Sequence, residues 1–236
     1  MKIHPKPPQR VSRAILPLAA LSLAFIIPQV EAGKVVSGYL NQATGKRAAV
    51  VSGKSNSASA GNSLVGAGQD NSASGYNATV LGGAQNTATT QGASVLTGYQ
   101  NANAGRDSAI LSGAKNQIEL GAVRSSVLAG SSNTIESTAW SSSIGAGYNN
   151  SNAGDKSAIL MGSNNMIGVG GDNTLVAGVN ASSDHKNSFV FNGDRLNPLA
   201  TTGDGQFLVN ATGGAVINGR TTIQGNLSVT GGLQRK

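Results

Sequence analysis

The only histidine downstream of residue 32 is His185, which follows Ser183 and Asp184 directly in the chain. A Ser-His-Asp triad requires these three groups to converge in space, and adjacency in the sequence does not provide that geometry. The chain has no Gly-x-Ser-x-Gly elbow, no Gly-x-x-x-x-Gly-Lys-Ser/Thr loop and no His-Glu-x-x-His motif. We therefore expect no catalytic residue and predict that the protein is not an enzyme.

The sequence also offers few candidate metal ligands. The chain has no cysteine, so it offers neither disulfides nor a thiolate metal site. Calcium-binding rolls repeat Gly-Gly-x-Gly-x-Asp turns, whereas this chain has one similar segment, at 168–172, that does not recur. We expect no metal and no cofactor.

Aromatic side chains are better candidates for function. Tyr99 and Tyr148 each follow a repeated glycine, Tyr76 follows another glycine, and Trp140 lies in a longer insertion. Aromatic residues in turns supply contact area for a glycan or a protein. The alternative is that they only cover gaps beside the turns, as scattered surface aromatics commonly do.

A short sequence motif occurs nine times, and it indicates where in the fold most of these residues lie. It consists of an aliphatic residue, two further residues, Gly, two variable residues and Asn. The glycines are Gly53, Gly68, Gly83, Gly98, Gly113, Gly130, Gly147, Gly162 and Gly178. They are 15, 15, 15, 15, 17, 17, 15 and 16 residues apart. A period this short is typical of stacked coils in a solenoid rather than of a globular core.

The glycine and the asparagine are predicted to be structural. The glycine fits a turn with positive φ or a close approach between coils. The asparagines are Asn56, Asn71, Asn86, Asn101, Asn116, Asn133, Asn150 and Asn165. Asparagine tolerates the left-handed conformation, and identical amides stacked about 4.7–4.8 Å apart can form a hydrogen-bonded ladder. This role is favoured over ligand binding. The ninth coil has Ala181 at the asparagine position.

The residues before each glycine predict a strand. Three residues before it stand Val50, Val65, Val80, Val95, Ile110, Val127, Ile144, Ile159 and Leu175, which we expect to point inward. The residues directly before the glycine, from Ser52 to Ala177, are mostly small and are predicted to share that interior.

The intervening position points to the opposite face. It holds Val51, Gly66, Leu81, Leu96, Leu111, Leu128, Gly145, Leu160 and Val176. Because most of these residues are large and apolar, both faces of the strand are predicted to be dry. One short coil is too narrow to bury both faces, so we expect chains to associate about a symmetry axis and enclose a shared core.

A second inward strand follows each asparagine. Its inward residues are Ala58, Ala73, Ala88, Asn103, Ile118, Ile135, Asn152 and Ile167. Second-turn glycines follow at Gly61, Gly75, Gly92, Gly105, Gly121 and Gly154. The two 17-residue steps place their extra residues in this second turn, around 120–125 and 136–142.

The predicted fold is therefore all-β: a parallel β-roll solenoid of about nine coils, each of about 15 residues, with a short β-rich C-terminal cap. Residues 1–32 combine a basic start with a 15-residue apolar run at 14–28 and a cleavage site after Ala32, typical of a signal peptide. The alternative is an uncleaved anchor. Residues 33–45 form a lead-in, 46–186 the roll and 187–236 the cap or neck. The protein is expected to be secreted, extracellular or on the cell surface.

Removing residues 1–32 leaves 13 basic and nine acidic residues, a net charge of +4. These charges are scattered, and no basic patch is interleaved with aromatics. Nucleic acid is therefore not an expected partner.

The segments at 94–101 (SVLTGYQN) and 108–116 (SAILSGAKN) resemble the head repeats of trimeric autotransporter adhesins, and the similarity spans about residues 46–190. The resemblance implies a left-handed parallel β-roll, three chains around one axis, and attachment to host matrix or other surfaces. Segments 189–193 and 205–218 resemble the closing segment of secreted haemagglutinin-like and phage tail-fibre-like proteins, with Phe189, Phe191 and Phe207 covering the open end of the stack. We find no heptad stalk and expect no intrinsic membrane anchor in the mature chain.

The function expected from the sequence is attachment by a homotrimer to an extracellular protein or glycan surface. Three alternatives remain. One is a structural subunit of an extracellular filament or coat. The second is binding of ice or another crystal surface, which would predict a repeated Thr-x-Thr row, whereas Thr87 and Thr89 occur in one coil only. The third is a trimeric enzyme that acts on polysaccharide.

Overall fold

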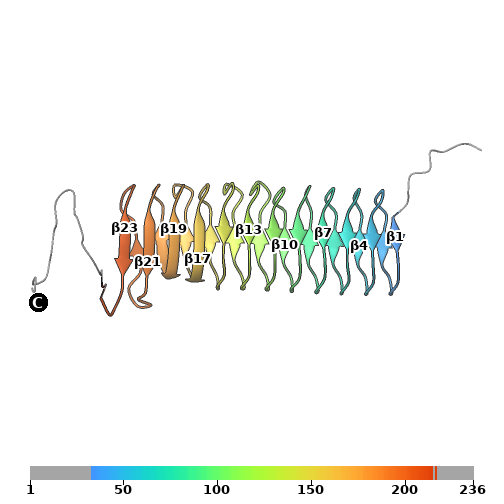
Figure 1. The fold of residues 1–236 in the computed structure, drawn as a ribbon, viewed down its shortest axis with the longest axis horizontal. Helices are drawn as coiled ribbons and strands as arrows, with labels where there is room; N and C mark the ends of the chain where they lie inside the picture. Colours follow the sequence, from blue (N-terminus) through green and yellow to red (C-terminus); the bar gives the residue numbers. More distant parts are fainter. Residues whose placement is uncertain (1–32, 215, 217–236) are drawn as a thin grey trace, which may run out of the picture. The chain divides into compact units, whose positions relative to one another are not determined.

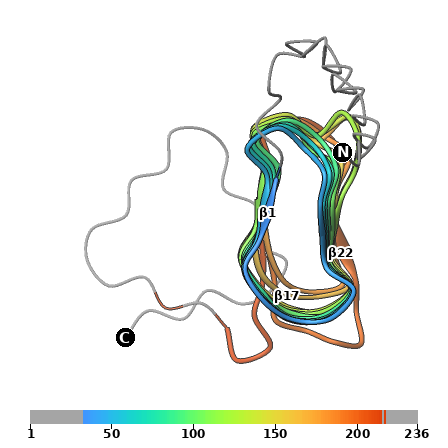
Figure 2. The same ribbon diagram turned by 90° about the vertical axis from the view of Figure 1, so that its right-hand side faces the viewer.

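The computed structural model describes residues 33–214 and residue 216. These residues form a parallel β-solenoid with two sheets and no helix (Figure 1). Each coil contributes one strand to each sheet, and two turns join the sheets at opposite ends of the flattened coil (Figure 2). The predicted all-β parallel solenoid is confirmed. The predicted signal peptide, and most of the predicted cap beyond residue 214, lie outside the described residues.

Sheet A contains twelve strands and sheet B eleven, and every pairing is parallel. Sheet A is formed by β1 (Lys34–Val35), β3 (Ala49–Val50), β5 (Leu64–Val65), β7 (Thr79–Val80), β9 (Ser94–Val95), β11 (Ala109–Ile110), β13 (Ser126–Val127), β15 (Ser143–Ile144), β17 (Ala158–Ser163), β19 (Leu175–Val179), β21 (Phe189–Asn192) and β23 (Phe207–Asn210). Sheet B is formed by β2 (Gln42–Ala43), β4 (Ser57–Ala58), β6 (Ser72–Ala73), β8 (Thr87–Ala88), β10 (Ala102–Asn103), β12 (Gln117–Ile118), β14 (Thr134–Ile135), β16 (Ser151–Asn152), β18 (Met166–Ile167), β20 (Ala181–Ser183) and β22 (Leu199–Ala200).

The solenoid has about twelve coils rather than the predicted nine. A further copy of the repeated motif, with Gly38 and Asn41, forms the first coil. At the C-terminal end, strand pairing continues although the glycine is lost: Asn192 pairs with Gly178, and Asn210 pairs with Asn192. The strands therefore extend into the segments that the sequence assigns to the lead-in and the cap.

The interior lies between the two sheets and is filled by two rows of side chains, which are aliphatic except for Asn103 and Asn152 in the sheet B row. The sheet A row from Val50 to Ile159 and the sheet B row from Ala58 to Ile167 are both fully buried. Burial of such side chains removes apolar surface from water and is the main stabilising term for each coil. The two sheets of one chain close over this core, so one of the two apolar strand faces is buried within a single chain. The association of chains over the opposite face stays a prediction.

Two details of the predicted strand are wrong. In the ninth coil, Val176 is the fully buried residue and pairs with Ile159, whereas Leu175 is only half-buried. This coil has one residue fewer between its inward side chain and its glycine. The positions before the glycines are half-buried or exposed in most coils, and Met161 is 63% exposed. The short strands end at the inward residue, so the chain has already bent into the turn.

Candidate binding surfaces

The repeated glycines hold the first turn in a conformation that other residues rarely adopt. Gly98 has φ +116°, and a Cβ at this position would collide with the carbonyl oxygen of Gly113 and the side-chain amide of Asn101. Both predicted reasons for the glycine, positive φ and close approach between coils, are confirmed. The second-turn glycines do not form one column: Gly61 lies against the ring of Tyr76, whereas Gly75 lies against the backbone of Thr90.

The repeated asparagines form the predicted amide ladder. The backbone N–H and Nδ2 of Asn101 both donate to Oδ1 of Asn86, at 3.0 and 3.2 Å. Nδ2 also donates to the carbonyl oxygens of Thr97 and Gly113, at 3.2 and 2.9 Å. The side chain is fully buried, so these bonds satisfy groups that water cannot reach. The left-handed residue is the one before the asparagine, Gln100 with φ 55°, rather than the asparagine itself.

The four candidate aromatics divide between two separate edges of the solenoid. Tyr99 and Tyr148 lie in one column of the first turn, which also contains Tyr39. Tyr76 and Trp140 lie in the second turn, where their carbonyl oxygens accept bonds from the next coil. All four are exposed, and the Arg124 guanidinium carbon lies 5.9 Å from the Trp140 ring centroid. The structure therefore does not combine the four aromatics into one binding site.

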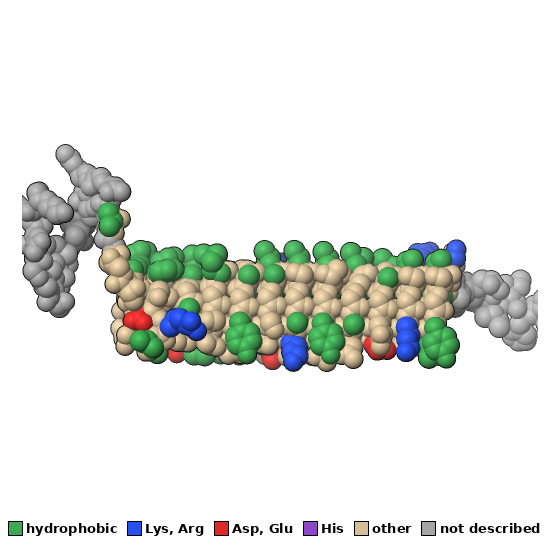
Figure 3. Space-filling model, turned by 90° about the horizontal axis from the view of Figure 1, so that it is seen from below, with side chains coloured by type: hydrophobic (Ala, Val, Ile, Leu, Met, Phe, Trp, Pro, Cys, Tyr) green, Lys and Arg blue, Asp and Glu red, His purple; other side chains and the backbone are tan. Residues whose placement is uncertain are grey.

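An apolar row follows one edge of the solenoid, where sheet A leads into the first turn. We call it the leucine row: Val51, Leu81, Leu96, Leu111, Leu128 and Leu160. Each side chain is between 36% and 47% exposed. Figure 3 shows hydrophobic side chains in a line along this edge. Val176, predicted to belong to the row, is inside the core. The row is interrupted at Gly66 and Gly145. Exposed apolar side chains that gather along one edge are typical of an interaction site.

The outer face of sheet B is polar. Ser57, Ser72 and Thr87 stack in register on β4, β6 and β8, and Ser59, Ser74 and Thr89 follow these strands. The hydroxyl surface is therefore broader than the single Thr-x-Thr pair noted in the sequence, because serine and threonine share one column.

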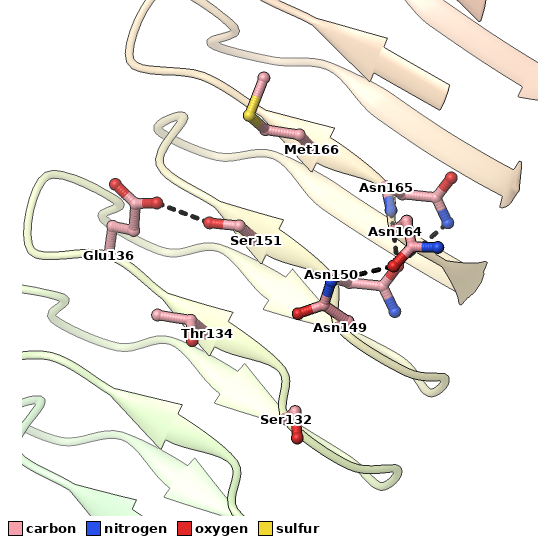
Figure 4. A pocket seen from close by; sticks show the side chains of 9 residues that line it. All are labelled: Ser132, Thr134, Glu136, Asn149, Asn150, Ser151, Asn164, Asn165 and Met166. Carbon is pink, nitrogen blue, oxygen red and sulfur yellow. Dashed lines mark hydrogen bonds between the residues drawn. The ribbon is translucent and has the colours of Figure 1, made fainter. Parts of the chain in front are cut away.

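A shallow depression opens on the C-terminal part of this face, across β14, β16 and β18 (Figure 4). We call it the polar hollow. It has a volume of about 340 Å³ and is lined by Ser132, Thr134, Glu136, Asn149, Asn150, Ser151, Asn164, Asn165 and Met166. Sequence reasoning missed it, because its residues come from different columns of three coils.

Hydrogen bonds order the walls of the polar hollow. Ser151 Oγ donates to Glu136 Oε1 at 2.6 Å on one side. Asn149 Nδ2 donates to Asn164 Oδ1 at 2.9 Å on the other side. Asn149 and Asn164 both have φ 55° and directly precede the ladder residues Asn150 and Asn165. Thr134, Ser151 and Met166 are stacked partners on the strands between these walls.

A second hydrogen-bonded ladder, which sequence reasoning missed, runs through the second turn. Oγ of Ser108 accepts from the N–H of Ser125 at 3.0 Å and donates to the carbonyl oxygen of Ala122 at 2.9 Å. The same pattern continues in the later coils through Ser125, Ser142, Ser157, Thr174 and Ser188. The sequence signal is the hydroxyl residue that recurs two places before each inward residue of sheet A from Ile110 onward.

The remaining polar groups offer little chemistry. His185 Nδ1 lies 2.8 Å from Thr201 Oγ1, and Thr201 Oγ1 lies 3.1 Å from the buried Ser183 Oγ. Asp184 takes no part in these bonds. Hydrogen bonds from the Asn197 side chain and the Leu196 backbone hold the pKa of Asp194 below its usual value, at an exposed loop. The described residues contain no cluster of three or more His, Cys, Asp or Glu side chains suited to a metal.

The sequence matches no protein-family model and no curated protein. None of the described residues belongs to a helix that is long and apolar enough to cross a membrane.

Proposed function

We propose that this protein is a secreted or cell-surface, adhesin-like homotrimer that attaches to host, matrix or glycan surfaces. The observation that carries the proposal is the leucine row, an exposed apolar line parallel to the axis of a solenoid whose core is already closed. Its side chains do not stabilise the interior of their own chain, so a contact with other copies is the simplest role for them.

Rotational symmetry suits this row. Copies related by an axis parallel to the solenoid bring the same edge together in every coil, which gives a closed assembly instead of an open fibre. Trimer formation is suggested by the resemblance to the heads of trimeric autotransporter adhesins. Three copies of each exposed turn would then act together, so that weak individual contacts give strong attachment.

One feature of the sequence supports an extracellular location. Residues 1–32 have the pattern of a signal peptide with cleavage after Ala32. The absence of cysteine removes disulfides as a source of stability, and the hydrogen-bonded ladders and the proposed assembly provide that stability instead.

Light scattering on the mature protein tests the assembly. We expect a trimeric mass for the wild type and a monomeric mass for the Leu96→Glu/Leu111→Glu variant, because charge cannot be buried in the contact. Leu120→Glu is a matched control, since Leu120 is 72% exposed and lies in the second turn outside the row. A folded wild-type monomer would contradict the proposal. A mass that rises with concentration, with fibres visible by electron microscopy, would favour the filament alternative.

Attachment is tested separately by arrays of glycans and matrix proteins. The wild type is expected to bind at least one surface, and the monomeric variant should bind it more weakly by about 10²–10⁴-fold because multivalency is lost. Equal binding by the monomer and the assembled protein would argue against the multivalent mechanism.

A further inference from the structure

We propose that the polar hollow binds one neutral hexose residue of a glycan. This inference rests on the proposed function, for which it supplies a ligand class and a site. The hollow spans three coils, and its volume of about 340 Å³ lies at the lower end of the range of about 300–1,000 Å³ found for small-molecule sites. A shallow site of this size suits a single sugar ring held against a face rather than a buried cofactor.

The walls present the hydrogen-bonding groups that a sugar requires. Within the described residues, no partner is found for Asn164 Nδ2, Asn149 Oδ1, Thr134 Oγ1 or Glu136 Oε2. One amide donor, one amide acceptor, one hydroxyl and one carboxylate oxygen can therefore face a ligand. Adjacent sugar hydroxyls both donate and accept, so they match a mixed set of this kind.

These groups are already oriented before a ligand arrives. The bonds from Ser151 to Glu136 and from Asn149 to Asn164 each fix one side chain and leave its second polar atom available. Figure 4 shows Glu136 on one side of the hollow and Asn149 and Asn164 on the other, with Thr134 and Ser151 between them. Preorganisation of this kind lowers the entropic cost of binding.

Charge selects a neutral ligand. Glu136 is the one charged residue that lines the hollow, and the lining contains no lysine or arginine. A sialic acid, uronic acid, sulfate or phosphate would meet a carboxylate with no compensating cation, which is unfavourable. Met166, which is 45% exposed, adds a flexible apolar wall for the C–H face of a sugar ring.

The same column of sheet B supplies a matched control. Ser72 occupies the position on β6 that Ser151 occupies on β16, outward and half-buried. Its stacked partners are Ser57 and Thr87, and Ser59 follows β4 as Glu136 follows β14. Ser59 and Thr87 therefore stand at the positions that Glu136 and Met166 occupy beside Ser151.

The test is a titration of the mature protein with methyl glycosides of glucose, galactose and mannose, followed by NMR, with sialyllactose as the anionic comparison. We expect at least one neutral glycoside to bind in the millimolar range and to bind more tightly than sialyllactose. Ser151→Trp should weaken binding by more than about tenfold, and Ser72→Trp by less than about twofold. Thr134→Val keeps the shape of the strand and removes one hydroxyl, so it should weaken binding by about two- to tenfold.

The inference is overturned if no neutral hexoside binds, if sialyllactose binds more tightly, or if Ser151→Trp and Ser72→Trp behave alike. Circular dichroism confirms that each variant is folded. Surface attachment by the wild type without hexoside binding would overturn the inference and leave the proposed function standing. Hexoside binding by a protein that attaches to no surface would support the inference and overturn the proposed function.

Discussion

The coils before Arg106 and those after it pair through the same two parallel sheets but differ in length and in their interiors. On sheet B, the earlier coils point Ala58, Ala73 and Ala88 inward, whereas later coils point Ile118, Ile135 and Ile167 inward. The larger side chains first appear in the 17-residue steps. Comparison of the two groups of coils shows that the first turn and both rows of strands keep their register, whereas the second turn lengthens where the interior side chains are larger.

Two buried asparagines mark the limits of the long coils. Asn103 and Asn152 both occur in the sequence Asn-Ala-Gly followed by a serine at the sixth position, and they lie on either side of the two 17-residue steps. Asn103 Nδ2 donates to the carbonyl oxygens of Ser94 and Ser108, and its Oδ1 accepts from the N–H of Gly105. Asn103 is stacked between Ala88 and Ile118, whereas Asn152 is stacked between Ile135 and Ile167. Asn152 forms the same three kinds of bond as Asn103, so neither amide is left unsatisfied.

The second turn also differs in its hydrogen bonding. From Ser108 onward, hydroxyl groups link each coil to the next. In the earlier coils the corresponding positions are Ala48, Ser63, Ala78 and Ala93, and Ser63 bonds only to Ala60 of its own coil. The amide ladder of the first turn, in contrast, runs through both regions.

The largest expected effect comes from substitutions in the amide ladder, which both regions share. Asn71→Asp and Asn133→Asp each place a carboxylate among carbonyl oxygens that now accept from an amide. Each variant should lose about 3–5 kcal/mol of stability, because a buried charge is left without a partner. Chemical denaturation followed by circular dichroism measures the loss. The exposed Gln117→Glu is the control. A loss confined to one of the two variants would show that the ladder matters in only one region.

A smaller effect tests the different interiors. Ile135→Ala leaves a cavity and should cost about 2–5 kcal/mol. The reciprocal Ala73→Ile adds volume beside a short second turn and should cost about 1–3 kcal/mol. Thermal unfolding with hydrogen exchange locates each loss along the solenoid. If Ala73→Ile is tolerated without cost, the length of the turn does not limit the size of the interior side chain.

The smallest effect concerns the hydroxyl ladder. Ser125→Ala removes the acceptor for the N–H of Ser142 and the donor to Ala139, and should cost about 1–3 kcal/mol. The reciprocal Ala78→Ser can form only a local bond like that of Ser63, so its effect should stay below about 1 kcal/mol. Denaturation midpoints for the two variants provide the measurement. Equal midpoints would mean that the ladder adds no stability to the C-terminal coils.

Sequence reasoning predicted the strands and both inward rows because each coil repeats the same local requirements. It misplaced Leu175 because the glycine spacing alone does not reveal a coil that is one residue short between Val176 and Gly178. It missed the last two coils for a similar reason, since Asn192 and Asn210 replace the glycine by which coils are recognised.

The candidate surfaces were less predictable. The sequence places Tyr99 after a repeated glycine and Trp140 in the second-turn insertion, and the stacking of the coils shows that these two turns form opposite edges. The polar hollow depends on how Glu136, Ser151 and Asn164 align across three coils of unequal length. One copy of the repeated motif does not show how residues of neighbouring coils align.

The sequence by itself determined the parallel solenoid, the turn glycines and the amide ladder, because a short period in register imposes the same backbone and hydrogen-bonding needs on every coil. The tertiary structure alone decided that one chain closes its own core, that the leucine row stays at an edge, and that a hydroxyl ladder and a hollow occur in the later coils. These features depend on where the backbone bends between strands and on which side chains of neighbouring coils come into contact.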